Sequence, residues 1–333
     1  MTRRSPIWYL LASLAAYFAL WNAIPRARFL VSASDWVDAC LRGAHQPLAT
    51  ILLILGVIIL SIPTIAFMAA QVSIIYYFAR LRLRFVGGLL WLVGCLAGSA
   101  VVVAVMVWRS GIVTKLHRLP SLREIGLVMG IYSGGPLGMV VYTLILLAAA
   151  SIGCMVSLRV KDKNLLLPVV MFAATIDFWT VTAGPVSSMM QHAPELLKAV
   201  SAPIPKAGTG AFVPALAMGP GDPLFIALVF AAVHRLGLNA RRNFAFVLAL
   251  MTAGMLAVMM NLVPYLPALV VLAIAVIAAN RREFKLTRQE KISTAIVAVV
   301  LVATIPLVWH LLKPLETPKR KPAPPIAAPR SRS

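Results

Sequence analysis

The sequence predicts an all-α, polytopic membrane protein, and composition and patterning carry this prediction. Of the 333 residues, 61% are hydrophobic and only 12% are charged, against about 45–50% apolar and about 25% charged in typical soluble domains. A chain of this size cannot bury so much apolar surface in water, so its solvent is a lipid bilayer. The apolar residues form continuous runs rather than the alternating pattern of a membrane β-barrel.

Nine apolar runs follow one another along the chain. A run of about 20 residues crosses about 30 Å of hydrocarbon as a helix, because lipid leaves free backbone groups without partners. The second and fourth runs are long enough to tilt or to extend beyond the membrane. We therefore expect about nine transmembrane helices, at residues 7–24, 47–78, 85–108, 127–157, 165–183, 212–233, 243–260, 264–279 and 291–312.

The distribution of Lys and Arg predicts the orientation. The first run reads as a retained span, because Pro25 and Arg26 follow it without the small-residue pattern of a signal-peptide cleavage site. Basic residues are concentrated in the loops around 80–84, 159–163, 235–242 and 281–291. Cytoplasmic loops are enriched in Lys and Arg, so this distribution favours a cytoplasmic N-terminus.

The net charge of +21 fits contact with anionic lipid, and no nucleic-acid-binding motif is present. The three cysteines, Cys40, Cys95 and Cys154, lack the spacing of a disulfide framework or a zinc site. We expect neither a metal nor an organic cofactor. The sequence also lacks H-E-x-x-H, G-x-S-x-G and P-loop motifs, so a zinc protease, a serine hydrolase and an ATP-driven pump are unsupported.

Two carboxylates stand out against this background. Of ten acidic residues, only Asp177 and Asp222 lie within apolar runs, where a charged carboxylate costs about 2.5–3.5 kcal/mol. Asp177 lies seven residues before Gly184 and Asp222 lies eleven residues after Ala211. If both runs are helices joined by the intervening loop, the carboxylates lie about 10 and about 16 Å from the same membrane surface. We therefore expect them to meet.

Two carboxyl groups in contact share one proton, because two like charges close together in an apolar site are costly. The ionised group can take a proton from water while its protonated partner donates to a peptide carbonyl oxygen. Such a pair hydrolyses a peptide bond without a covalent intermediate.

Two irregular motifs accompany the aspartates. Gly219-Pro220-Gly221-Asp222-Pro223 should kink or unwind its helix, since each proline removes a backbone hydrogen bond and glycine permits close approach. Pro267-Ala268-Leu269 is a second irregularity, at the start of the eighth run.

In this order, Asp177, the G-x-G-D sequence at 219–222 and the P-A-L sequence at 267–269 resemble the presenilin and signal peptide peptidase family of intramembrane aspartyl proteases. The resemblance covers about 165–280 and is closest to a compact, prokaryotic-type homologue. It implies a presenilin-like helical bundle in the cytoplasmic membrane of a prokaryote, which cleaves single-span membrane-protein substrates.

The resemblance also implies roles for individual residues. Asp177 and Asp222 would be the catalytic pair, and Gly219 and Gly221 would shape the helix of the second aspartate. Pro267, Ala268 and Leu269 would pack beside the active site and position the substrate.

Three features depart from the family pattern. Ile176 replaces the tyrosine that usually precedes the first aspartate, Asp177 lies in the fifth run rather than the sixth, and the run at 291–312 follows the P-A-L span.

The predicted organisation has four parts. A scaffold of about four transmembrane helices spans 1–164, a catalytic core spans 165–280, an extra helix spans 281–312, and a disordered basic tail spans 313–333.

Other functions remain open from the sequence. The aspartates could instead form a proton or cation relay in a transporter or channel, where broken helices also occur, or serve a non-catalytic binding role. Type IV prepilin peptidases share the G-x-G-D sequence but cleave at the membrane surface.

Overall fold

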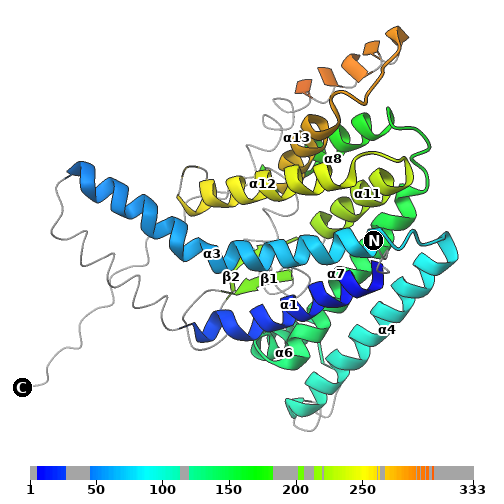
Figure 1. Ribbon diagram of the computed structural model, residues 1–333. Coiled ribbons are helices and arrows are strands. Elements are labelled where there is room, and N and C mark those ends of the chain that lie inside the picture. Colours follow the sequence, from blue (N-terminus) through cyan, green and yellow to red (C-terminus); the bar gives the residue numbers. More distant parts are fainter. Residues whose placement is uncertain are drawn as a thin grey trace, which may run out of the picture.

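The computed structural model describes residues 6–27, 46–112, 120–182, 202–205, 214–219, 221–260, 262, 267–289 and parts of 291–303. The described residues form a helical bundle with one two-stranded sheet (Figure 1). The predicted tail and most of the predicted run at 291–312 lie outside these residues.

Five of the described helices are long and apolar enough to cross a membrane, which confirms the helical membrane protein. They are α1 (Pro6–Arg26), the Ile54–Ala79 part of α3 (Gln46–Ala79), α4 (Phe85–Arg109), α7 (Pro136–Ser157) and α12 (Ala240–Met259). Nine full spans are not confirmed. The helices α8 (Leu166–Thr182), α11 (Gly221–Arg235) and α13 (Ala268–Asn280) have 17, 15 and 13 residues, fewer than the about 20 that a full crossing needs.

The expected single helix over 127–157 is wrong. The chain forms α6 (Leu122–Tyr132), turns, and begins α7 at Pro136. Gly135 has an extended backbone, because the ring of a following proline disfavours the helical conformation. Pro136 then occupies the first helical turn, where its missing N–H costs nothing. The apolar run continues through this break, so hydropathy alone does not predict it.

The expected helix over 212–233 is also wrong in its first half. β2 (Pro214–Met218) precedes α11 and pairs antiparallel with β1 (Ala202–Pro205). The β1 strand packs against α1, α3 and α7. Figure 1 shows the sheet beside the middle of the bundle.

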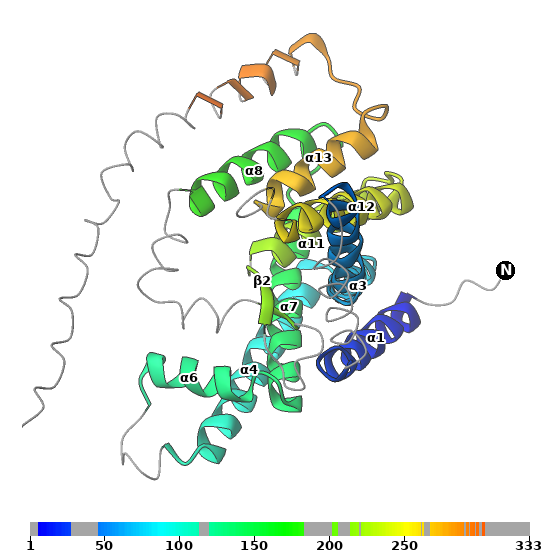
Figure 2. The same cartoon turned by 90° about the vertical axis from the view of Figure 1, so that its left-hand side faces the viewer.

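The helix α7 lies at the centre of the bundle, between α4 and α11 (Figures 1 and 2). In the most apolar stretch of α7, 61% of the residues are buried. In the corresponding stretch of α4, only 17% are buried. Leu90, Val101 and Trp108 on α4 are exposed, as expected for side chains that face lipid. The long helix α3 packs against α1, α11 and α12.

Gly153 allows α7 and α11 to approach backbone to backbone. A Cβ atom at Gly153 would overlap the Leu224 carbonyl oxygen and lie 2.9 Å from the Leu228 nitrogen. Small residues permit this kind of close helix crossing in membranes. Leu224 lies two residues after Asp222, so this contact fixes the half of α11 that carries the second aspartate.

Arginine side chains join the helices at one end of the bundle. Arg82 donates to the His234 carbonyl oxygen at 2.9 Å, and Arg242 donates to the Ala278 carbonyl oxygen at 3.3 Å. The third arginine, Arg235, donates to the carbonyl oxygens of Ser157 and Val160.

Each of these carbonyl groups lies in or just after the last turn of α11, α13 or α7, where four carbonyls lack helical partners and cations are favoured. We call this end of the bundle, with residues 80–84, 157–164, 234–242 and 278–285, the basic end. Its contacts gather these loops at one end of the bundle.

Asn243 and Asn280 join α12 to α13 near the basic end. The two fully buried amides exchange hydrogen bonds of 2.9 and 2.7 Å. Each amide also bonds a backbone carbonyl of its own helix. This reciprocal pairing satisfies groups that lipid could not and fixes the register of the two helices.

We predict that Gly153→Ala destabilises the protein, because the added methyl group must push α7 away from α11. Overpacking of this kind costs about 1–3 kcal/mol. Gly94→Ala in α4 is the matched control, since its Cβ meets nothing within 4 Å among the described residues. Thermal unfolding in detergent measures both variants. Equal melting temperatures for the two variants would contradict the close contact.

Candidate active site

Asp222 lies in the first turn of α11, not eleven residues into a helix as the sequence had suggested. The Gly219 N–H donates to Asp222 Oδ2 at 3.1 Å, and the Asp222 N–H donates to the Gly219 carbonyl oxygen at 3.2 Å. Pro223 is the third helical residue, where a backbone N–H has no helical partner. The motif therefore starts a helix rather than kinking one, and Asp222 exchanges hydrogen bonds with Gly219, three residues earlier.

Asp177 lies on α8 and caps a different helix. Its Oδ2 accepts a hydrogen bond of 2.9 Å from the Leu269 N–H, which belongs to the first turn of α13. Pro267 precedes α13 and provides no side-chain cap, so Asp177 supplies the acceptor that a capping residue normally supplies. The positive end of the α13 dipole also favours a carboxylate at this position.

The structure makes neighbours of the helices that carry the two carboxyl groups. The helix α8 packs along α13, and α11 contacts both of them, as Figures 1 and 2 show from two directions. Asp222 lies 13 residues from Arg235 and Asp177 lies 11 residues from Leu166. At 1.5 Å per residue they are about 20 and about 17 Å from the basic end. The two carboxyl groups therefore lie at similar distances from the basic end, on helices that contact each other.

The hydrogen bonds leave part of each carboxyl group available for chemistry. Both aspartates are half-buried, and each uses Oδ2 to accept from a backbone N–H. Neither Oδ1 accepts a hydrogen bond from the described residues. Two fixed carboxyl groups with one unoccupied oxygen each can share a proton and bind a water molecule.

The other predicted site residues have mainly backbone roles. Gly219 supplies the N–H that binds Asp222, and Leu269 supplies the N–H that binds Asp177. Pro267 and Ala268 form the start of α13. A Cβ at Gly221 would meet nothing within 4 Å among the described residues, so this glycine is not required for space.

One residue that positions the site was missed from the sequence. Gly153 fixes α11 behind Asp222, although it lies in the predicted N-terminal scaffold. The signal was a row of small residues at four-residue intervals, Ala149, Gly153 and Ser157, which is typical of close helix contacts.

Comparisons with known proteins add no assignment: no protein-family model, curated protein or solved structure matches this chain.

We predict that Asp177→Ala and Asp177→Asn differ in stability although both remove the carboxylate. An asparagine oxygen can still accept from the Leu269 N–H, whereas alanine leaves the start of α13 uncapped, which costs about 0.5–2 kcal/mol. Thermal unfolding and hydrogen exchange of the first α13 turn measure the difference. Equal stability of the two variants would show that Asp177 does not cap α13.

Proposed function

We propose that the chain is an intramembrane aspartyl protease of the G-x-G-D type, as its resemblance to the presenilin and signal peptide peptidase family implies. One observation carries this proposal: the two acidic residues of the apolar runs lie on the contacting helices α8 and α11, at similar distances from the basic end. Carboxylates inside a membrane are rare and mark functional sites. A pair of them has the composition of an aspartic protease dyad.

The proposed reaction uses one proton shared by Asp177 and Asp222. The ionised carboxylate takes a proton from a water molecule as the water oxygen attacks the carbonyl carbon of the peptide bond. The protonated carboxyl group donates its proton to the carbonyl oxygen. The newly protonated carboxyl group then donates its proton to the leaving nitrogen, while its ionised partner takes a proton from a hydroxyl group of the tetrahedral diol. The C–N bond breaks, and the pair returns to its starting state.

The surroundings of the pair suit this chemistry. The backbone N–H groups of Gly219 and Leu269 hold the carboxyl groups, so little reorganisation is needed when charge moves between them. The starts of α11 and α13 place positive dipole ends beside the pair and offset its net negative charge in an apolar environment.

The proposed substrates are single-span membrane proteins, and the proposed location is the cytoplasmic membrane of a prokaryote, with the N-terminus in the cytoplasm. A helical substrate must unwind, because its own hydrogen bonds shield the peptide bond. The β2 strand ends at Met218 and leads directly to Asp222. An extended substrate segment that pairs with the free edge of this sheet would lie next to the aspartates.

We predict that Asp177→Asn and Asp222→Asn each reduce cleavage of a single-span reporter protein by at least about 100-fold, since each removes one partner of the proton transfer. The measurement uses purified protein and reporter in the same vesicles, with mass spectrometry to locate the cut within the span. Glu124→Gln is the matched control, because it also turns a carboxylate into an amide and a capping box accepts either residue.

Continued cleavage by either aspartate variant would contradict the proposal. A cut near the membrane surface beside a basic leader would indicate a prepilin-type peptidase instead. Aspartate-dependent ion flux without cleavage would indicate a transporter or channel.

A further inference from the structure

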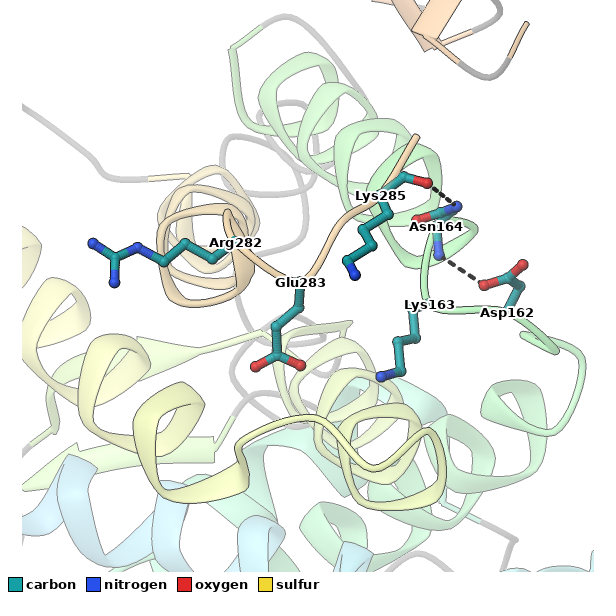
Figure 3. Close-up of a pocket in the computed structure, with 6 residues that line it drawn as sticks. All are labelled: Asp162, Lys163, Asn164, Arg282, Glu283 and Lys285. Atoms are coloured by element: carbon teal, nitrogen blue, oxygen red, sulfur yellow. Dashed lines mark hydrogen bonds between the residues drawn. The ribbon is translucent and has the colours of Figure 1, made fainter. Parts of the chain in front are cut away.

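A cavity that is open to the surface lies at the basic end, away from the aspartates. The cavity has a volume of ≈ 380 Å³ and lies where the turn between α7 and α8 meets the chain that follows α13 (Figure 3). Small-molecule sites usually have about 300–1,000 Å³. The cavity is lined by Asp162, Lys163, Asn164, Arg282, Glu283 and Lys285.

Two of the lining residues build the wall of the cavity. Asp162 Oδ1 accepts a hydrogen bond of 3.2 Å from the Asn164 N–H, and Asn164 Nδ2 donates to the Lys285 carbonyl oxygen at 3.3 Å. The second bond links the start of α8 to the segment after α13. Asp162 and Asn164 are therefore engaged in holding the site together.

Three charged groups remain available to a ligand. Lys163 and Lys285 lie on one side of the cavity and Glu283 on the other, whereas Arg282 points away from them (Figure 3). The side chains of Lys163, Lys285 and Glu283 form no hydrogen bond or ion pair with the described residues. Glu283 would repel a simple anion, and the two lysines would repel a simple cation. A ligand that carries both charges complements all three groups.

The position of the cavity indicates where such a ligand comes from. The apolar helices end at the basic end in loops rich in Lys and Arg, and loops of this kind lie at the depth of lipid headgroups. Leu165 and Phe172 on or near α8 and Ile274 on α13 are 47%, 54% and 54% exposed. The two helices beside the cavity, α8 and α13, thus expose apolar side chains on their surface.

We propose that this cavity binds the headgroup of an aminophospholipid of the phosphatidylethanolamine class. The phosphate diester lies between the ammonium groups of Lys163 and Lys285, and the headgroup ammonium donates to the Glu283 carboxylate. A bound lipid bridges the α7–α8 turn and the segment after α13, which the hydrogen bond from Asn164 to the Lys285 carbonyl oxygen also joins. It stabilises the α8–α13 pair, and this inference does not depend on protease activity.

The test uses the full chain, purified and delipidated in detergent, and measures lipid binding by native mass spectrometry and thermal unfolding. Phosphatidylethanolamine should bind more tightly than phosphatidylglycerol, which lacks an ammonium group, and than phosphatidylcholine, whose quaternary ammonium has no N–H. Lys163→Gln with Lys285→Gln should weaken binding about tenfold or more, because charged hydrogen bonds are lost.

Two further variants make the test specific. Arg109→Gln with Arg123→Gln removes the same charge near the other end of α7 and should leave binding unchanged. Glu283→Gln should abolish the preference for phosphatidylethanolamine over phosphatidylglycerol. The proposal is overturned by equal binding of all three lipids, by equal loss in both double variants, or by tighter binding of soluble phosphoethanolamine than of the lipid.

Discussion

The hydrogen bond from the Leu269 N–H to the Asp177 carboxylate is the interaction on which the candidate site depends. A carboxylate in an apolar bundle needs a donor, and the first turn of a buried helix needs an acceptor. Here each satisfies the other, and the bond joins α8 to α13. The family resemblance implies that P-A-L positions substrate. In this structure the same motif positions the Asp177 carboxyl group, and it does so through the backbone N–H of Leu269 rather than through a side chain.

The other end of the bundle keeps this arrangement in register. Arginine side chains bind the last carbonyls of α7, α11 and α13, and the paired amides of Asn243 and Asn280 fix α13 against α12. Near the opposite end of α11, Gly153 sets the distance between α7 and the residues after Asp222. The short helices α11 and α13 are thus held at both ends, Asp177 joins α8 to α13, and the two aspartates lie at similar distances from the basic end. Lipid alone could not impose that alignment, because it does not distinguish one apolar face from another.

Hydropathy predicted the helices well where a single run met a single span, as in α1, α4 and α12, because lipid forces such runs to be helical. It failed where backbone geometry mattered more than polarity. Gly135-Pro136 ends one helix and starts another within a continuous apolar run, and the apolar Pro214–Met218 segment forms a strand. The aspartate pair was visible from the sequence because acids are rare in apolar runs. The hydrogen bond from the Leu269 N–H to Asp177 could not be predicted from the sequence. Every residue except proline has a backbone N–H, and the fold determines which acceptor it finds.

The central claim is that Asp177 and Asp222 lie within reach of one another. Its most direct test is cross-linking of Asp177→Cys with Asp222→Cys, in a chain whose three native cysteines are replaced by alanine and whose α8–β1 connection carries a specific protease site. After treatment with a short bifunctional thiol reagent and cleavage at that site, we expect the two halves to remain joined on a denaturing gel. Asn243→Cys with Asn280→Cys, cut between α12 and α13, is the positive control. Complete separation of the halves, while the control pair stays joined, would contradict the account.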